Sequence, residues 1–184
     1  MRNEQAIEQL QKWGRNPHYL PGAQLKKKRL SLSNDLNSIV EAADLIILCI
    51  PAAFLDGELQ KLKQGLKDKI VVSAVKGVIP ENLQIVGDYL HNQWQVPYNQ
   101  IGVIAGPSHA EEVAMEKLSY LTIACQDQKK AEFIASLLST SYVRTKVSND
   151  IFGTEYAAML KNIYSIAAGI AHGLGYGDNF QSVL

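Results

Sequence analysis

The sequence is poor in several features that mark common classes of protein. It contains two cysteines, Cys49 and Cys125, and neither has the neighbours that a zinc site requires. Its 18 basic and 18 acidic side chains cancel, which argues against nucleic acid or an anionic membrane as the main partner. No apolar run is long enough to span a bilayer, and the first residues lack the apolar core of a secretory signal. We therefore expect a cytoplasmic protein with buried free thiols, no membrane span and no bound metal.

Strand-like and helix-like patterns alternate through most of the chain. Short apolar runs bounded by polar residues or proline predict buried strands, and helical spacing of apolar residues predicts the segments between them. The expected strands are 29–33, 44–51, 69–77, 100–110 (its end opening a helix), 120–125 and 143–147, and the expected helices are 3–13, 33–43, 52–66, 81–91 and 128–138. Buried strands that alternate with helices predict an α/β fold with a parallel sheet covered on both faces.

A long helix is predicted from Asp150 to His172, with Asp150 as its N-cap and a glycine-rich exit. It is unusually rich in small residues, which allow another backbone or a ligand to approach closely. Helical spacing places one lysine on a stripe of small residues: Thr154, Ala158, Lys161 and Ser165. Lys161 is then either a lysine that extends to water or an amine that binds an anion or catalyses a reaction.

Three of the expected strands end in residues that suit a ligand site. These ends are Pro51, Lys76 with Gly77, and the Gly106–Ser108 turn. Ligands of open parallel sheets bind outside the carboxyl ends of the strands, so Pro51, Lys76 and Gly106 should lie along one edge. Ser108 and Glu111 have the spacing of a capping box, and a helix N-terminus attracts anions. Two lysines beside such a terminus predict a small phosphorylated or carboxylated substrate, although Lys76 is equally compatible with a solvated strand end.

Three other motifs give weaker predictions. The segment 106–110 resembles the G-x-S-x-G turn of serine hydrolases with Ser108 as nucleophile, but its last residue is Ala110 and Pro107 constrains the backbone before the serine. His109 and Glu111 match part of a deaminase zinc motif whose second half is missing. The glycines at 173, 175 and 177 follow a helix, whereas a dinucleotide fingerprint follows a strand.

Six segments occur in the order found in NAD(P)-dependent glycerol-3-phosphate dehydrogenases. They are NPHYLPG, the strand ending in Pro51, Lys76-Gly77, GPSHAEEVA, SNDIFGTEYAAMLKN and GIAHGLGYGDN. The chain therefore resembles the bacterial type of this family over nearly its whole length. The 6-phosphogluconate and 3-hydroxyisobutyrate dehydrogenases are similar, but they separate the catalytic lysine and asparagine by a helical turn, whereas Lys161 and Asn162 are adjacent.

The resemblance implies a fold and an activity. Residues 1–148 would form a partial Rossmann-type sheet that binds NAD or NADP, and residues 149–184 would begin an all-α substrate-binding domain. The reaction would be reduction of dihydroxyacetone phosphate to sn-glycerol 3-phosphate, which supplies glycerophospholipid synthesis, and the full-length enzyme would form a homodimer. The implied site residues are the catalytic Lys161, the substrate-binding Lys76, Gly106, Ser108 and Asn162, and the cofactor-binding Pro51, Lys76 and Ala110.

The sequence also departs from the family pattern. The family begins with a strand, a G-x-G-x-x-G turn and a helix, and nothing before Asn16 matches that unit. The family also continues past Leu184 into a helical domain that closes on the phosphate. We therefore expect this chain to correspond to the middle of the enzyme and to bind NAD(H) poorly by itself. The alternative is a non-catalytic remnant of the enzyme.

Overall fold

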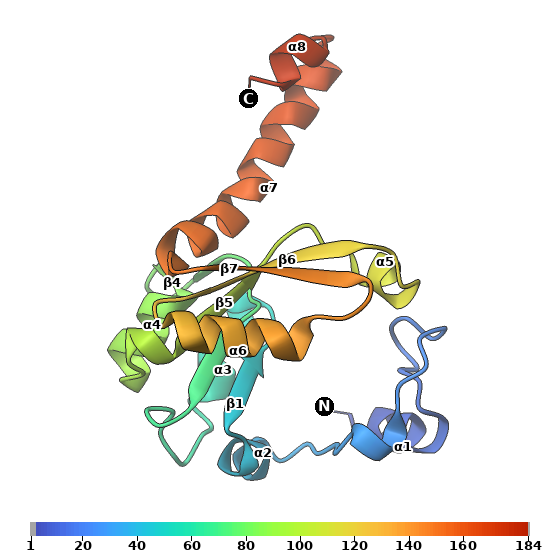
Figure 1. Cartoon of the computed structure of the whole chain (residues 1–184), viewed down its shortest axis with the longest axis vertical. Helices are drawn as coiled ribbons and strands as arrows, with labels where there is room; N and C mark the ends of the chain where they lie inside the picture. The colour runs from blue at the N-terminus through green and yellow to red at the C-terminus, as the bar shows by residue number, and fades with distance from the viewer. Residues whose placement is uncertain (1–2, 184) are drawn as a thin grey trace.

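The computed structural model describes residues 3–183. It shows an α/β body from which one long helix extends (Figure 1). Five strands form the main sheet in the order β1-β2-β5-β6-β7: Leu45–Leu48, Ile70–Ser73, Ile101–Ala105, Ser119–Cys125 and Val143–Ser148. A small hairpin pairs β3 (Val78–Ile79) with β4 (Gln84–Ile85). The helices are α1 Glu4–Trp13, α2 Leu36–Ala42, α3 Ala52–Leu59, α4 Val86–Trp94, α5 Ala110–Ala114, α6 Gln128–Leu138, α7 Ile151–Gly173 and α8 Asp178–Gln181, with 3₁₀ turns at Lys27–Arg29 and Tyr98–Gln100.

The sheet is mostly parallel, and one pair of strands departs from the prediction. β1, β2 and β5 are parallel neighbours, and β6 is parallel to β7, but β5 and β6 are antiparallel with Ala105 opposite Thr122. A parallel connection needs a crossover that returns across the sheet, usually on a full helix. The link between β5 and β6 contains only the five-residue α5. It turns the chain round instead, so the expectation of an entirely parallel sheet is wrong at this pair.

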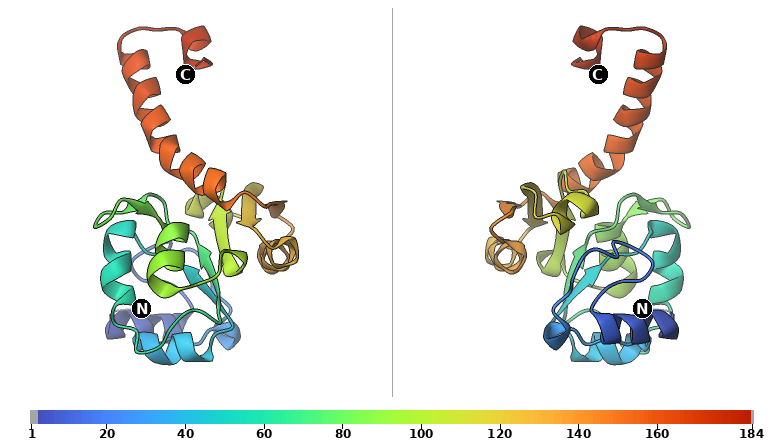
Figure 2. Two further views of the ribbon diagram at one scale, coloured as in Figure 1. Left: turned by 90° about the vertical axis from the view of Figure 1, so that its left-hand side faces the viewer. Right: turned by 90° about the vertical axis from the view of Figure 1, so that its right-hand side faces the viewer.

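Helices cover both faces of the sheet, as the buried apolar strands predict. Val71 and Val72 are both fully buried, and successive strand residues point to opposite faces. Val71 belongs to the larger core with α3 and α4, whereas Val72 packs with Ile134 of α6. Figure 2 shows α6 on one side of the sheet and α3 and α4 on the other.

β1 differs from the buried strand that its composition predicts. It is at the edge of the sheet, and Ile47 is 40% exposed. Cys49, which follows it, is exposed, whereas Cys125 in β6 is buried. The expectation of two buried thiols is therefore correct for Cys125 and wrong for Cys49, because an apolar sequence does not show whether a neighbouring strand covers it.

Other element boundaries differ from those expected. Residues 30–33 form no strand and follow the exposed 3₁₀ turn Lys27–Arg29. α3 ends at Leu59, earlier than expected, and α4 begins at Val86 because residues 78–85 first form the β3–β4 hairpin. By contrast, α6 has the bounds expected from the sequence.

The long helix α7 begins as predicted, with Asp150 as its cap. An Asp150 carboxylate oxygen accepts a hydrogen bond from the Gly153 N–H at 2.7 Å, and the Thr154 hydroxyl donates to the Asp150 carbonyl at 2.6 Å. Between Glu155 and Ala171 no α7 residue is buried, and Figure 1 shows the helix projecting from the body with α8 at its far end. None of the helices within residues 3–183 has both the length and the apolarity to cross a membrane.

Candidate active site

The carboxyl ends of three strands meet at one edge of the sheet, as predicted. β1, β2 and β5 run in the same direction, so Pro51, Lys76 and Gly106 all follow strands that end at this edge. β7 runs against β5, so α7 starts near the opposite edge and returns along the sheet. At 1.5 Å per residue, the first ten residues of α7 span about 15 Å, which carries Lys161 back toward the ends of β2 and β5.

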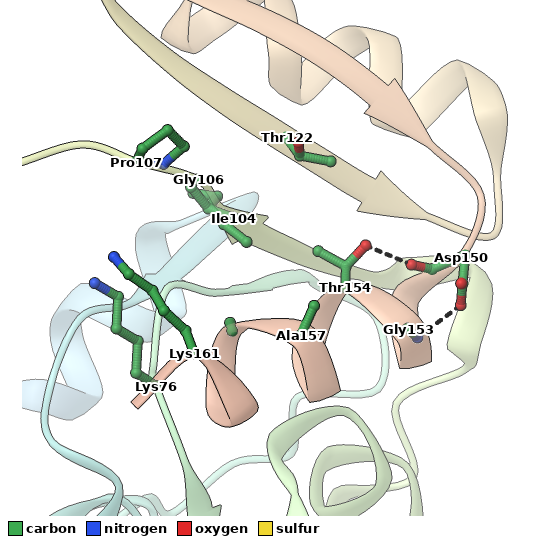
Figure 3. Close-up of a pocket in the computed structure, with 12 residues that line it drawn as sticks. Lys76, Ile104, Gly106, Pro107, Thr122, Asp150, Gly153, Thr154, Ala157 and Lys161 are labelled. Carbon is green, nitrogen blue, oxygen red and sulfur yellow. Dashed lines mark hydrogen bonds between the residues drawn. The ribbon is translucent and has the colours of Figure 1, made fainter. Parts of the chain in front are cut away.

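An open pocket of about 540 Å³ lies between this edge and α7 (Figure 3). Its walls come from the ends of β2 and β5, from the middle of β6 and from the first three turns of α7. The lining residues are Lys76, Ile104, Ala105, Gly106, Pro107, Thr122, Asp150, Gly153, Thr154, Ala157, Ala158 and Lys161. The small residues on this side of α7 therefore leave room between the helix and the sheet.

Two lysines give the pocket its positive charge. The amine groups of Lys76 and Lys161 point in the same direction at one end of the pocket (Figure 3), and both side chains are exposed. Within residues 3–183 neither lysine forms an ion pair, so both ammonium groups remain available to a ligand. Asp150 lines the other end, where its carboxylate accepts a hydrogen bond from the Gly153 N–H. Paired cations beside a concave wall suit a phosphate or carboxylate.

Gly106 shapes the rim of the pocket at the end of β5. Its φ of 137° lies in a region that residues with a side chain rarely adopt. A Cβ at this position would collide with the carbonyl oxygen of Tyr120 and come within 3.2 Å of the Leu121 Cα. The turn therefore requires glycine, which lets the β5 end pass close to β6.

The other predicted site residues are not part of the pocket lining. Pro51 is the exposed N-cap residue of α3, and Ala110 is the exposed first residue of α5. Asn162 is exposed beside Lys161, and Ser108 is partly exposed in the turn that leads to α5. The pocket lining thus includes Lys76, Gly106 and Lys161, whereas it does not include Pro51, Ser108, Ala110 or Asn162.

The predicted capping box at Ser108 is wrong. α5 starts at Ala110 with His109 as its N-cap residue, and no side chain caps it. Glu111 instead accepts a hydrogen bond from the Tyr19 hydroxyl at 3.0 Å, which raises the pKa of Tyr19. No hydrogen bond joins Ser108 to a histidine within the described residues, so the geometry of a serine hydrolase is not present there.

Two residues near the pocket were not predicted from the sequence. Thr122 enters the lining through the antiparallel register of β5 and β6, which no local pattern reveals. Glu155 of α7 is 6% exposed, and burial raises its pKa to about 7, with the Asp88 charge acting in the same direction. Hydrogen bonds from the Gly87 and Val86 N–H groups act in the opposite direction. Glu155 follows the buried Ile151 by one helical turn, a spacing that places a carboxylate on the core-facing side of α7.

Comparison with protein families gives two matches in succession. Residues 1–131 match the profile of the NAD-dependent glycerol-3-phosphate dehydrogenase N-terminus, and residues 150–184 match the profile of the C-terminus of the same enzymes. The glycerol-3-phosphate dehydrogenase [NAD(P)+] of Alcanivorax borkumensis is 33% identical over 170 residues, which cover 92% of this chain and 49% of that protein. The corresponding protein of Syntrophomonas wolfei is 35% identical over 188 residues and is covered to 54%.

The fold agrees with these sequence matches. The solved structure of DsGPDH of Dunaliella salina superposes with a TM-score of 0.83 at 27% identity, covering 98% of this chain and 31% of that one. The chain spans about half the length of the curated relatives it matches.

Proposed function

The chain belongs to the NAD-dependent glycerol-3-phosphate dehydrogenase family, and we propose that its pocket is the substrate site of an enzyme reducing dihydroxyacetone phosphate to sn-glycerol 3-phosphate. The observation that carries the proposal is the convergence of Lys76, Gly106 and Lys161 on one pocket. Relatives in this family use NAD(P). The substrate joins a ketone to a phosphate, and a pocket with two ammonium groups offers one for each.

Lys161 is the proposed acid/base. Reduction of a ketone delivers a hydride to the carbonyl carbon and requires a proton on the oxygen. The Lys161 ammonium donates that proton in the forward reaction, and the amine takes it back in the reverse reaction. Its place on α7, facing the strand ends across the pocket, supports this role.

Lys76 and the turn after β5 hold the substrate in this proposal. The Lys76 ammonium neutralises negative charge, and the absence of a side chain at Gly106 lets the substrate approach the backbone. Ser108 and Asn162, at the margins of the pocket, contact the substrate once it is bound. Pro51 and Ala110, which flank the same edge, lie against the cofactor together with Lys76.

The chain contains only part of a dinucleotide site. Pyrophosphate binding in this fold rests on a glycine-rich turn between a strand and a helix N-terminus, and the sequence has no G-x-G-x-x-G. The three proposed cofactor contacts, Pro51, Lys76 and Ala110, do not supply such a turn. We accordingly expect weak NAD(H) binding by these 184 residues, which keeps a non-catalytic role as the second candidate.

The test is a dihydroxyacetone phosphate reduction assay with NADH and NADPH. Lys161→Ala should lower kcat by about 10²–10⁴-fold, the usual effect of losing a general acid, while the circular dichroism spectrum stays unchanged. Lys63→Ala, which removes an exposed lysine away from the pocket, is the matched control. Normal turnover by Lys161→Ala would refute the assignment. Absence of turnover in the unmodified chain, with no NADH binding by calorimetry, would favour the non-catalytic role.

A further inference from the structure

Among residues 3–183, Glu155 is the only buried carboxylate. The other buried polar side chains between residues 3 and 183 are two serines, Ser73 and Ser119. An ionisable group this deeply buried requires compensating contacts. Glu155 finds them on another element, since its carboxylate accepts a hydrogen bond from the Gly87 N–H at 2.9 Å.

The partner of Glu155 is the start of α4. Ile85, the N-cap residue of α4, provides no side-chain hydrogen bond, so the first N–H groups of this helix depend on a distant acceptor. Glu155 supplies that acceptor from 68 residues away. Gly87 leaves the necessary space, because a Cβ there would lie 2.8 Å from the Glu155 Oε2. The Glu155 carboxylate therefore packs closely against the start of α4 at Gly87 and joins α4 to α7.

Neighbouring contacts hold the same junction together. Asp88, the nearest charged group on α4, accepts a hydrogen bond from the Tyr98 hydroxyl at 2.8 Å. The Tyr98 ring meets Phe152 of α7 edge-on, with centroids 5.4 Å apart, and stacks on His91 at 4.0 Å. Ile151, one turn before Glu155, is fully buried. The first turns of α7 are therefore fixed on the body by Ile151, Phe152 and Glu155.

Glu155 is the last of these anchors before the pocket lysine. No residue between Glu155 and Ala171 is buried, and Lys161 stands six residues, or about 9 Å, beyond Glu155 along the axis. A tilt of about 10° at the anchor would displace this part of the helix by about 1.5 Å. A displacement of 1 Å at a reacting group can cost about 100-fold in rate.

We propose that Glu155 is a positioning residue: by binding the N-terminus of α4, it sets the direction in which α7 leaves the sheet and so the place of Lys161 beside Lys76 in the pocket. Its consequence for catalysis rests on the proposed function, whereas its consequence for the direction of α7 does not. The two consequences call for two separate measurements.

The first measurement is a distance that does not depend on activity. One spin label is attached to the exposed Cys49 and another to Ile166→Cys, in a Cys125→Ala background. Double electron–electron resonance then measures the distance between the two labels, which reports the direction of α7. The unmodified junction should give one narrow distance distribution. Glu155→Ala should at least double its width, and Glu155→Gln should preserve it, because the amide oxygen still accepts from the Gly87 N–H.

Two further variants keep this measurement decisive. Gly87→Ala crowds the carboxylate from the side of α4, and it should shift or broaden the distribution even if Glu155→Ala does not fold. Glu132→Ala removes an exposed carboxylate on α6 and should leave it unchanged. The proposal would be overturned if a folded Glu155→Ala variant, or Gly87→Ala, gave a distance distribution with the same width and the same centre as the unmodified chain.

The second measurement is steady-state kinetics with dihydroxyacetone phosphate. Glu155→Ala should reduce kcat at least tenfold with less than a twofold change in KM, and Glu155→Gln should restore most of it. A lower kcat with an unchanged distance distribution would refute positioning and leave the dehydrogenase function standing. If the unmodified chain shows no turnover, the proposed function fails, and the distances alone decide the role of Glu155.

Discussion

The substitution Gly106→Ala tests the geometry of the pocket rim directly. Alanine at a φ of 137° is strained, since side-chain-bearing residues held in such regions cost about 1–3 kcal/mol. The added Cβ also collides with the Tyr120 carbonyl oxygen, which belongs to a paired strand and cannot swing away as a flexible side chain would. Together these effects should lower the free energy of unfolding by about 3 kcal/mol or more, at or above the upper end of the usual range for a single substitution.

The control for this variant is Gly57→Ala in α3. Gly57 lies in a helix and is exposed, and a methyl group added to it would point into open space, with no neighbouring element within 4 Å. Alanine favours a helix interior over glycine, so this change should stabilise the chain by about 0.5–1 kcal/mol. The two variants add the same methyl group and differ only in backbone conformation and surroundings.

Urea unfolding followed by Trp94 fluorescence measures both variants. Trp94 is partly buried against the main core and donates a hydrogen bond to the Tyr89 hydroxyl, so its emission reports on the body. With typical total stabilities of about 5–15 kcal/mol, a loss of about 3 kcal/mol moves the urea midpoint far below that of the unmodified chain. An unchanged midpoint for Gly106→Ala would show that the turn after β5 does not have the described conformation.

Three further predictions concern the cap of α7, its buried carboxylate and the two thiols. Asp150→Ala should destabilise the chain by about 1 kcal/mol in urea unfolding, because the Gly153 N–H loses its acceptor; an unchanged midpoint would contradict the cap. The pKa of Glu155 is about 7 in the folded chain and 4.5 ordinarily, so the folded state keeps a proton that the unfolded state releases between these values. Stability should therefore fall by at most about 3 kcal/mol as the pH rises from 4.5 to about 7, and Glu155→Gln should flatten this slope, whereas a rise would refute the assignment. Iodoacetamide should alkylate the exposed Cys49 in the native chain and reach the buried Cys125 only on unfolding, and mass spectrometry of the peptides separates the two.

Local sequence patterns determined many individual elements of this protein. The spacing of apolar residues predicted α6 with its observed bounds, and Asp150 predicted the start of α7. The alternation of strands and helices predicted that the residues after β1, β2 and β5 share one edge, which the parallel pairing confirms. The family resemblance, drawn from six short segments, is confirmed by the profile matches. Such features depend on residues a few positions apart, so the sequence displays them directly.

Long-range contacts decided the rest. The antiparallel β5–β6 pair, which brings Thr122 into the pocket, follows from how the short α5 link turns the chain. An apolar run such as β1 looks the same whether or not another strand covers it, so its exposure and that of Cys49 become visible only in the fold. Glu155 is the clearest case, because its acceptor role depends on a helix start 68 residues away. The sequence alone thus determined many of the elements and the family, whereas the tertiary structure decided strand direction, burial and the contacts that orient α7, since these depend on which distant segments meet.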